Sequence, residues 1–216
     1  NNTTVTIEGG TIETAQGGQS YGDYDAGDGI HSDSGLTISG KATIVSAIGG
    51  KDDSDSSSNA GHGIYSGGDL TIKDGTTIGS WNTDGTPDTA TGALGGDAAA
   101  GEQGGSGIYS DGTLFISENA TITNATGGSG KQGGSGILGK TMKILASTIQ
   151  KAIGGRVTGE DGTGGNGICS GNDLAISGSS SITNATGGSG KWGGDVIFSE
   201  HDLTISGSAN IGTAQG

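Results

Sequence analysis

The sequence predicts an all-β fold, a single-stranded right-handed parallel β-helix of about seven coils that spans residues 1–216 as one domain. Three observations predict it: glycine reaches 50 residues, there is one proline, and short apolar patterns recur along the whole chain. Collagen would need a proline-rich period, which is absent. With only 29% hydrophobic residues, the chain is suited to a narrow core that is filled coil by coil, as in repeat proteins.

The first element of each coil is an isoleucine that follows glycine or valine and is itself followed by an outward residue. It recurs at 29–32, 63–66, 107–110, 136–139, 167–170 and 196–199. Because alternate residues of a strand face opposite sides, the isoleucine points to the core and the next residue to solvent. Stacking the coils gives a predicted outward column of His31, Tyr65, Tyr109, Leu138, Cys169 and Phe198.

The second and third elements complete a coil of three short strands. An apolar-x-Ile triplet recurs at 36–38, 70–72, 114–116, 142–144, 174–176 and 203–205, and a further isoleucine at 44, 78, 122, 149, 182 and 211. A small residue usually follows three positions later, with Trp81 as the exception that opens the longest insertion and is interpreted as an anchor. All length variation is expected in one loop, because the remaining distance ranges from 15 residues (Ile122 to Ile137) to 30 (Ile78 to Ile108). We expect the glycines to serve tight corners with positive φ.

Charge and cysteine content predict the compartment and exclude several partners. Nine Lys and Arg against 23 Asp and Glu give a formal charge of −14. This excludes nucleic acid, which needs a basic surface, and anionic membranes. No apolar run is long enough for membrane insertion. The lone Cys169 argues against a disulfide-stapled secreted domain and favours an extracellular or cell-surface bacterial protein. Without a signal peptide, the chain is expected to be a mature chain or a segment of a longer protein.

The first complete unit carries a resemblance to a known group of proteins. It reads Asp-Gly-Ile-His-Ser-Asp at 28–33, followed by Leu-Thr-Ile-Ser-Gly at 36–40. These motifs resemble the repeats of carbohydrate-binding parallel β-helix domains, with a pectate-lyase-like coil, in clostridial and other Gram-positive surface proteins. The resemblance covers the whole chain and implies an extracellular, non-catalytic domain that binds polysaccharide, with calcium as a candidate cofactor. Later units depart from the motif, which limits a carried-over calcium site to Asp28 and Asp33.

The outward column supplies the candidate carbohydrate-binding residues. His31, Tyr65, Tyr109 and Phe198 would stack on sugar rings, unless the long loops fold back over them to form a satellite core. Trp192 lies in a glycine-rich loop whose counterpart holds Gln132. Its ring is either a ligand platform or an anchor that holds the loop to the rod.

Calcium is predicted from a second pattern as well. The segment 23–29 alternates carboxylates before a glycine, as an oxygen cage requires, although it does not match the EF-hand loop. The candidate ligands are Asp25, Asp28 and Asp33. An acidic surface would repel pectin-like chains unless calcium bridges them, so neutral glycans are the better class of ligand.

Catalysis is the weakest of three hypotheses. A lyase or hydrolase needs paired carboxylates or a base beside a metal, whereas Arg156, Lys151, Glu160 and Asp161 are expected to form a solvated loop. His31, His62 and His201 lie in different coils and no motif joins them. A glycan-binding adhesin module ranks first, and a structural stalk that associates end to end ranks second because neither terminus carries a capping unit.

Overall fold

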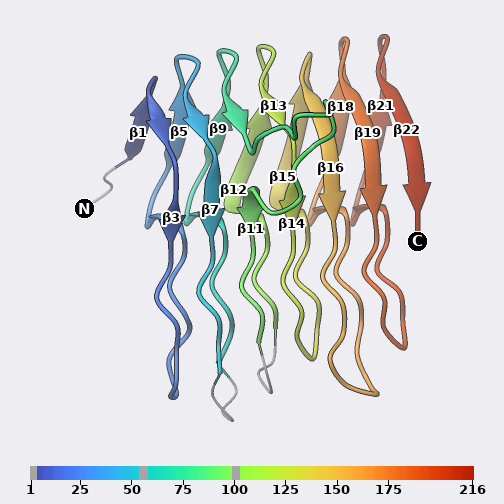
Figure 1. Ribbon diagram of the computed structural model, residues 1–216. Helices are drawn as coiled ribbons and strands as arrows, with labels where there is room; N and C mark the ends of the chain where they lie inside the picture. The colour runs from blue at the N-terminus through green and yellow to red at the C-terminus, as the bar shows by residue number, and fades with distance from the viewer. Residues whose placement is uncertain (1–3, 54–57, 99–102) are drawn as a thin grey trace.

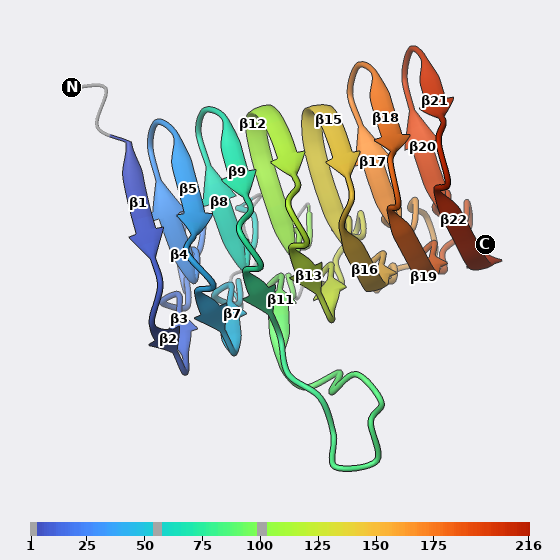
Figure 2. The same cartoon turned by 90° about the horizontal axis from the view of Figure 1, so that it is seen from above.

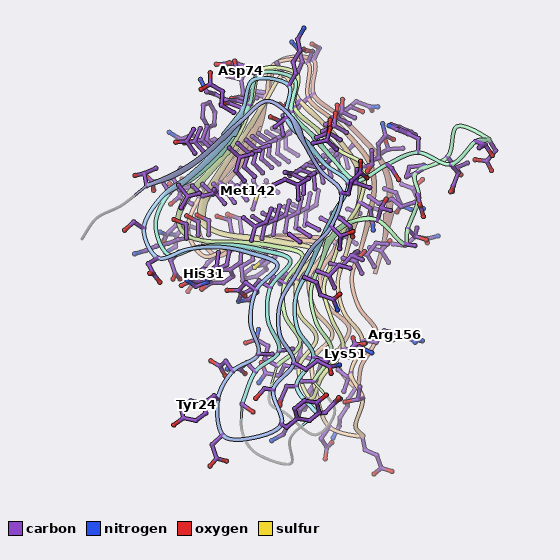
Figure 3. The ribbon with its side chains drawn as sticks, turned by 60° about the vertical axis from the view of Figure 1, so that its left-hand side comes forward. Tyr24, His31, Lys51, Asp74, Met142 and Arg156 are labelled. Atoms are coloured by element: carbon purple, nitrogen blue, oxygen red, sulfur yellow. The ribbon has the colours of Figure 1, made fainter. Side chains whose placement is uncertain are left out.

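The computed structural model describes residues 4–53, 58–98 and 103–216 and confirms the predicted parallel β-helix. These residues contain no helix, and their strands stack in parallel into a solenoid of about six turns (Figure 1). Viewed from the N-terminal end, the chain turns clockwise as it recedes, so the solenoid is right-handed (Figure 3). No helix in the described part of the chain could cross a membrane.

The strands are short and repeat in the same order in every coil. They are β1 (Val5–Glu8), β2 (Thr11–Ile12), β3 (Ala15–Gln16), β4 (Ile30–Ser32), β5 (Leu36–Ser39), β6 (Thr43–Ile44), β7 (Ser46–Ile48), β8 (Ile64–Ser66), β9 (Leu70–Ile72), β10 (Thr77–Ile78), β11 (Gly92–Leu94), β12 (Ile108–Ile116), β13 (Thr121–Ile122), β14 (Ala125–Thr126), β15 (Ile137–Leu145), β16 (Thr148–Ile153), β17 (Ile168–Ser170), β18 (Leu174–Ser177), β19 (Ser181–Thr186), β20 (Ile197–Ser199), β21 (Leu203–Ile205) and β22 (Asn210–Gln215). The first complete coil therefore has four strands, β4 to β7, where the sequence predicted three. The additional strand forms because the segment around Ala47 also pairs with its neighbours.

The register of the strands reproduces the sequence repeat. In one sheet Leu36 pairs with Val5 and Leu70, and the series continues through Leu114, Met142, Leu174 and Leu203. In the other sheet the third-strand isoleucines pair from Ile12 to Ile211. Equivalent residues thus lie directly above one another, about 4.8 Å apart.

The inward columns form one narrow aliphatic core. Ile38, Ile72, Ile116, Ile144 and Ile176 are fully buried, and the leucine and isoleucine columns beside them are buried too, except in the first and last coils. Met142 takes the place of leucine in its coil and lies in the same core (Figure 3). Because successive coils present the same side chain at the same place, the core is filled without aromatic residues.

A second packed region, joined mainly by backbone contacts between loops, extends from the body as a leg (Figure 3). We call the stacked loop segments at 17–29, 49–53, 58–63, 95–98, 103–107, 127–136, 154–167 and 187–196 the glycine leg. Its loops are joined by an unbroken series of amide-to-carbonyl hydrogen bonds of 2.7–3.0 Å. The series runs through Gly18, Gly27, Gly50, Gly61, Gly96, Gly105, Gly128, Gly134, Gly155, Gly165, Gly188 and Gly194.

The glycines of the leg do not serve tight corners with positive φ, as the sequence predicted. Positive φ is found at nine glycines among the described residues, none of them in the series of hydrogen-bonded glycines. In the leg glycine is required for close approach instead. A Cβ atom on Gly128 would lie 1.8 Å from the carbonyl oxygen of Gly96, a distance that no side chain can occupy.

The chain varies in length at two places, the leg loops and a separate insertion, so the prediction of a single variable loop is wrong. The insertion accounts for the longest spacing in the repeat. Residues 79–91 leave the body between β10 and β11 and project from it, as the extended green loop in Figure 2 shows. Ala93 pairs with Ala47 and Ala125 and fills the small-residue column. The sequence suggested Trp81 for that column. Trp81 instead lies half-exposed in the insertion and pairs with Pro87.

Candidate functional site: a groove beside an aromatic stack

An open groove of 660 Å³ lies where the body meets the glycine leg, across the first three complete coils. Its described lining consists of Asp25, Ala26, Gly27, Asp28, His31, Asn59, His62, Tyr65, Gln103, Gly104, Ser106, Tyr109 and Asp111. Figure 3 shows His31 on the outer face of the body, above the leg. Body and leg both contribute, so the groove depends on the packing of both.

The predicted outward column forms, and its first three rings stack on one another. Pairing of β4, β8 and β12 aligns His31, Tyr65 and Tyr109. The ring centroids of His31 and Tyr65 lie 4.8 Å apart, and those of Tyr65 and Tyr109 lie 5.4 Å apart with an interplanar angle of 5°. Because the faces cover each other, the stack presents ring edges and polar atoms to the groove. Stacking of a sugar on the face of Tyr65, as the sequence suggested, is therefore blocked.

Asp111 holds the two tyrosines in register. Its carboxylate accepts a hydrogen bond of 2.9 Å from the hydroxyl of Tyr65 and one of 2.7 Å from the hydroxyl of Tyr109. Burial and this hydrogen bond raise the pKa of Tyr65 to about 12, and the same two causes raise the pKa of Tyr109 well above its ordinary value. Both phenols are therefore neutral and act as hydrogen-bonding groups rather than as bases.

His31 is held between two carboxylates. Its Nδ1 lies 2.6 Å from Asp28 Oδ2 and its Nε2 lies 2.9 Å from Asp33 Oδ1, while 48% of its side chain remains exposed. Burial alone would lower the pKa of His31, but the hydrogen-bonded carboxylates of Asp28 and Asp33 outweigh burial and raise it above 6.5. His31 therefore gains a proton more readily than a free histidine.

His62, in contrast to His31, is held in its neutral form. The backbone N–H of Ser106 donates to His62 Nδ1 at 2.8 Å, which assigns the ring proton to Nε2 in the neutral form. Burial lowers the pKa of His62, and the carboxylates of Asp28 and Asp111 offset this only in part. The ring stacks on both Tyr65 and Tyr109, with its centroid 4.6 Å from that of Tyr109.

His62, Asp111, Asn59, Gln103 and Ser106 belong to the groove although the sequence reasoning did not select them. His62 occupies the repeat position of Asp28, and the side chain of each accepts the backbone N–H of the equivalent residue in the next coil. Asp111 occupies the position of Asp33 in its own coil. Comparison of these repeat positions was the available signal. No sequence motif joins His31 and His62, but both rings stack on Tyr65.

The predicted calcium ligands do not form an oxygen cage. Both oxygens of Asp28 accept hydrogen bonds, from His62 N and from His31 Nδ1. Asp25 accepts the backbone N–H of Asn59, and Asp33 lies at the rim beside His31. Among residues 4–53, 58–98 and 103–216, no group of three or more His, Cys, Asp or Glu is arranged to hold a metal ion. Calcium binding stays a prediction.

The other candidate residues lie away from the groove. Phe198 continues the column in the last coil, and Leu138 and Cys169 lie between it and Tyr109. Burial raises the pKa of the Cys169 thiol, in agreement with a filler role for this residue. Trp192 is 58% exposed, and Lys191 lies 5.1 Å from the centre of its ring. The groove thus gathers three of the five predicted carbohydrate-binding residues.

Of the residues weighed as a catalytic site, Arg156, Glu160 and Asp161 lie in a loop of the leg, whereas Lys151 lies in β16 of the body and not in the expected loop. Lys191 pairs with Asp161, while Arg156 and Glu160 are exposed. That the chain is not an enzyme stays a prediction.

The contributions of His31 and His62 to folding stability depend on pH in opposite directions. Because the folded-state pKa of His62 is lowered, the unfolded chain takes up a proton first on acidification and stability falls below about pH 6.5. The folded-state pKa of His31 is raised, so its contribution is complete below about pH 6.5 and is lost at higher pH. A His31→Asn variant is therefore expected to melt at lower temperature as pH falls from about 8 to about 5, and a His62→Asn variant at higher temperature.

Thermal denaturation followed by circular dichroism measures both melting temperatures. All other titratable groups are common to the two variants, so the difference between the two slopes isolates the histidines. Parallel slopes would contradict the assigned protonation states.

Comparison with protein-family models, with curated proteins and with solved structures finds no match to this chain. The resemblance to carbohydrate-binding β-helix domains therefore stays a prediction, and function has to be argued from the groove.

Proposed function

We propose that this protein is a non-catalytic extracellular module that binds polysaccharide in the groove beside the aromatic stack. The observation that carries the proposal is the open groove of 660 Å³, lined by ring edges, carboxylates and amides that converge from three coils. A volume of this order is typical of sites for small ligands. The open sides leave room for a chain longer than the groove itself.

The lining suits sugar hydroxyls. Asp25, Asp28 and Asp111 offer carboxylate oxygens, each able to accept more than one hydrogen bond. The amides of Asn59 and Gln103 both donate and accept. The ring edges of Tyr65 and Tyr109 offer apolar contact for sugar C–H groups.

The scaffold holds these groups before any ligand arrives. The tyrosines are fixed by Asp111, His31 by two carboxylates, and His62 by the backbone of the next coil. A preorganised site loses little conformational freedom on binding, which favours affinity for weakly binding ligands such as glycans.

A Tyr109→Ala variant is expected to lose polysaccharide binding, with a dissociation constant at least about tenfold weaker. Tyr109 contributes both to the ring stack and to the Asp111 hydrogen bond that orders the groove. Retention of the wild type and the variant is measured on a panel of soluble and insoluble polysaccharides, with calcium and then with EDTA. Loss of binding in EDTA would identify a calcium-dependent glycan complex.

Phe198→Ala is the matched control. Phe198 lies in the same outward column but outside the groove, so its removal is expected to leave binding unchanged. Melting temperatures verify that both variants are folded. If the folded wild type is retained by no polysaccharide in either condition, the binding proposal is wrong and the structural-stalk hypothesis takes its place.

A further inference from the structure

The charge of the groove restricts the chemistry of its ligand. Asp25, Asp28 and Asp111 line it, and Asp33 adjoins it through His31. The described lining residues include no lysine or arginine, and the whole chain has a formal charge of −14. His31 and His62 are the described lining side chains able to carry positive charge; burial favours the neutral form of His62, and His31 is already paired with two carboxylates. The groove is therefore an anionic site in an acidic protein.

The polar groups that remain for a ligand are mostly acceptors. The hydroxyls of Tyr65 and Tyr109 donate hydrogen bonds to Asp111, and the ring nitrogens of His31 form hydrogen bonds with Asp28 and Asp33. Carboxylate and phenol oxygens keep further lone pairs. A ligand that complements this surface has to bring donors of its own.

One buried hydroxyl indicates independently that a polar group binds at the floor of the groove. Ser106 lines the groove and is 1% exposed, yet its Oγ has no hydrogen-bond partner among the described residues. Buried hydroxyls are normally hydrogen-bonded. A sugar hydroxyl at this floor could pair with Ser106 Oγ. His62, which carries its ring proton on Nε2, lines the same groove.

We propose that the groove prefers polysaccharide whose sugar units carry a free amine, a 2-amino-2-deoxyhexose polymer, with the ammonium group beside Asp111. This inference rests on the proposed function and narrows its ligand. An ammonium group brings three donors and the charge that the carboxylates lack. N-acetylation removes that charge, and a uronic acid would place a like charge in the groove.

The test compares three hexasaccharides with the same β-1,4 linkage, built from glucosamine, N-acetylglucosamine and glucose. Isothermal titration calorimetry is done at mildly acidic pH, where the sugar amine is protonated, at low and at high salt. The glucosamine hexamer is expected to bind about tenfold more tightly than the other two, as one charge pair in a half-buried site allows. Its advantage is expected to decrease with salt.

Variants locate the effect. Asp111→Asn is expected to remove the advantage of the amine, so that the glucosamine hexamer binds no more tightly than the acetylated and glucose hexamers. Asp25→Asn gives a second reading if Asp111→Asn does not fold. Glu200→Gln is the control, because Glu200 has the same repeat position as Asp111, lies outside the groove and changes the net charge equally.

The outcomes separate the two proposals. Equal binding of all three hexamers overturns the amine inference and leaves polysaccharide binding intact. Binding of none of them, together with none on the polysaccharide panel, overturns the proposed function itself. If a polyamine without sugar rings competes as well as the glucosamine hexamer, or if Glu200→Gln weakens binding as much as Asp111→Asn, the general acidity of the chain explains the effect and the inference fails.

Discussion

Gly128→Ala is expected to destabilise the protein by about 3–5 kcal/mol. The added Cβ would lie 1.8 Å from Gly96 O and 2.5 Å from Gly96 C, both of them backbone atoms. Neighbouring loops of the leg would have to separate. That movement strains the hydrogen bonds from Gly128 N to Gly105 O and from Gly134 N to Gly128 O. Buried backbone groups without partners cost about 1–3 kcal/mol each.

Urea denaturation followed by circular dichroism gives the free energy of unfolding. Gly159→Ala is the control, since Gly159 is exposed and a Cβ there would meet nothing within 4 Å. The control is expected to be neutral or slightly stabilising, because alanine restricts the unfolded chain. A loss below about 1 kcal/mol for Gly128→Ala would show that the leg is not a packed element.

Ile116→Ala is expected to destabilise the protein by about 2–5 kcal/mol. Ile116 is fully buried between Ile72 and Ile144, and a rigid column of stacked coils can close little of the cavity that remains. Ile205→Ala, at the same column position in the last coil, removes the same atoms from a side chain that is 49% exposed.

The same denaturation measurement compares the two isoleucine variants. Ile205→Ala is expected to cost less than about half as much as Ile116→Ala, because far less buried surface is lost. Equal losses would contradict the account of a core that is built from stacked columns.

The body could be predicted from the sequence because its information is local. Leu-x-Ile triplets set the inward face by strand period alone, and their recurrence fixed the register that the sheets show. The outward column of His31, Tyr65 and Tyr109 followed from the same pattern.

The leg and the insertion could not be predicted in the same way. Glycine serves both corners and close approach, and only the spatial pairing of distant loops distinguishes the two uses. The projecting loop at 79–91 was not recognised as a separate insertion. The spacing between successive isoleucines of the repeat includes both this loop and the leg loop that follows it, so their lengths could not be told apart. Gly79 and Gly92, with φ of 95° and 112°, mark where it leaves the body and rejoins it.

The candidate site was predicted in part. The aromatic column was found, but its rings cover each other rather than a sugar. His62 and Asp111 were missed because their roles depend on contacts across coils: His62 with the backbone of Ser106, and Asp111 with Tyr65.

The most direct test of glycan binding in the groove follows the imidazole signals of the three histidines by NMR during titration with each hexasaccharide. His31 and His62 line the groove, whereas His201 lies in the last coil. Binding in the groove predicts that the His31 and His62 signals shift with saturation while the His201 signal stays in place. Unchanged signals for His31 and His62, under conditions where calorimetry detects binding, would place the ligand elsewhere and contradict the account.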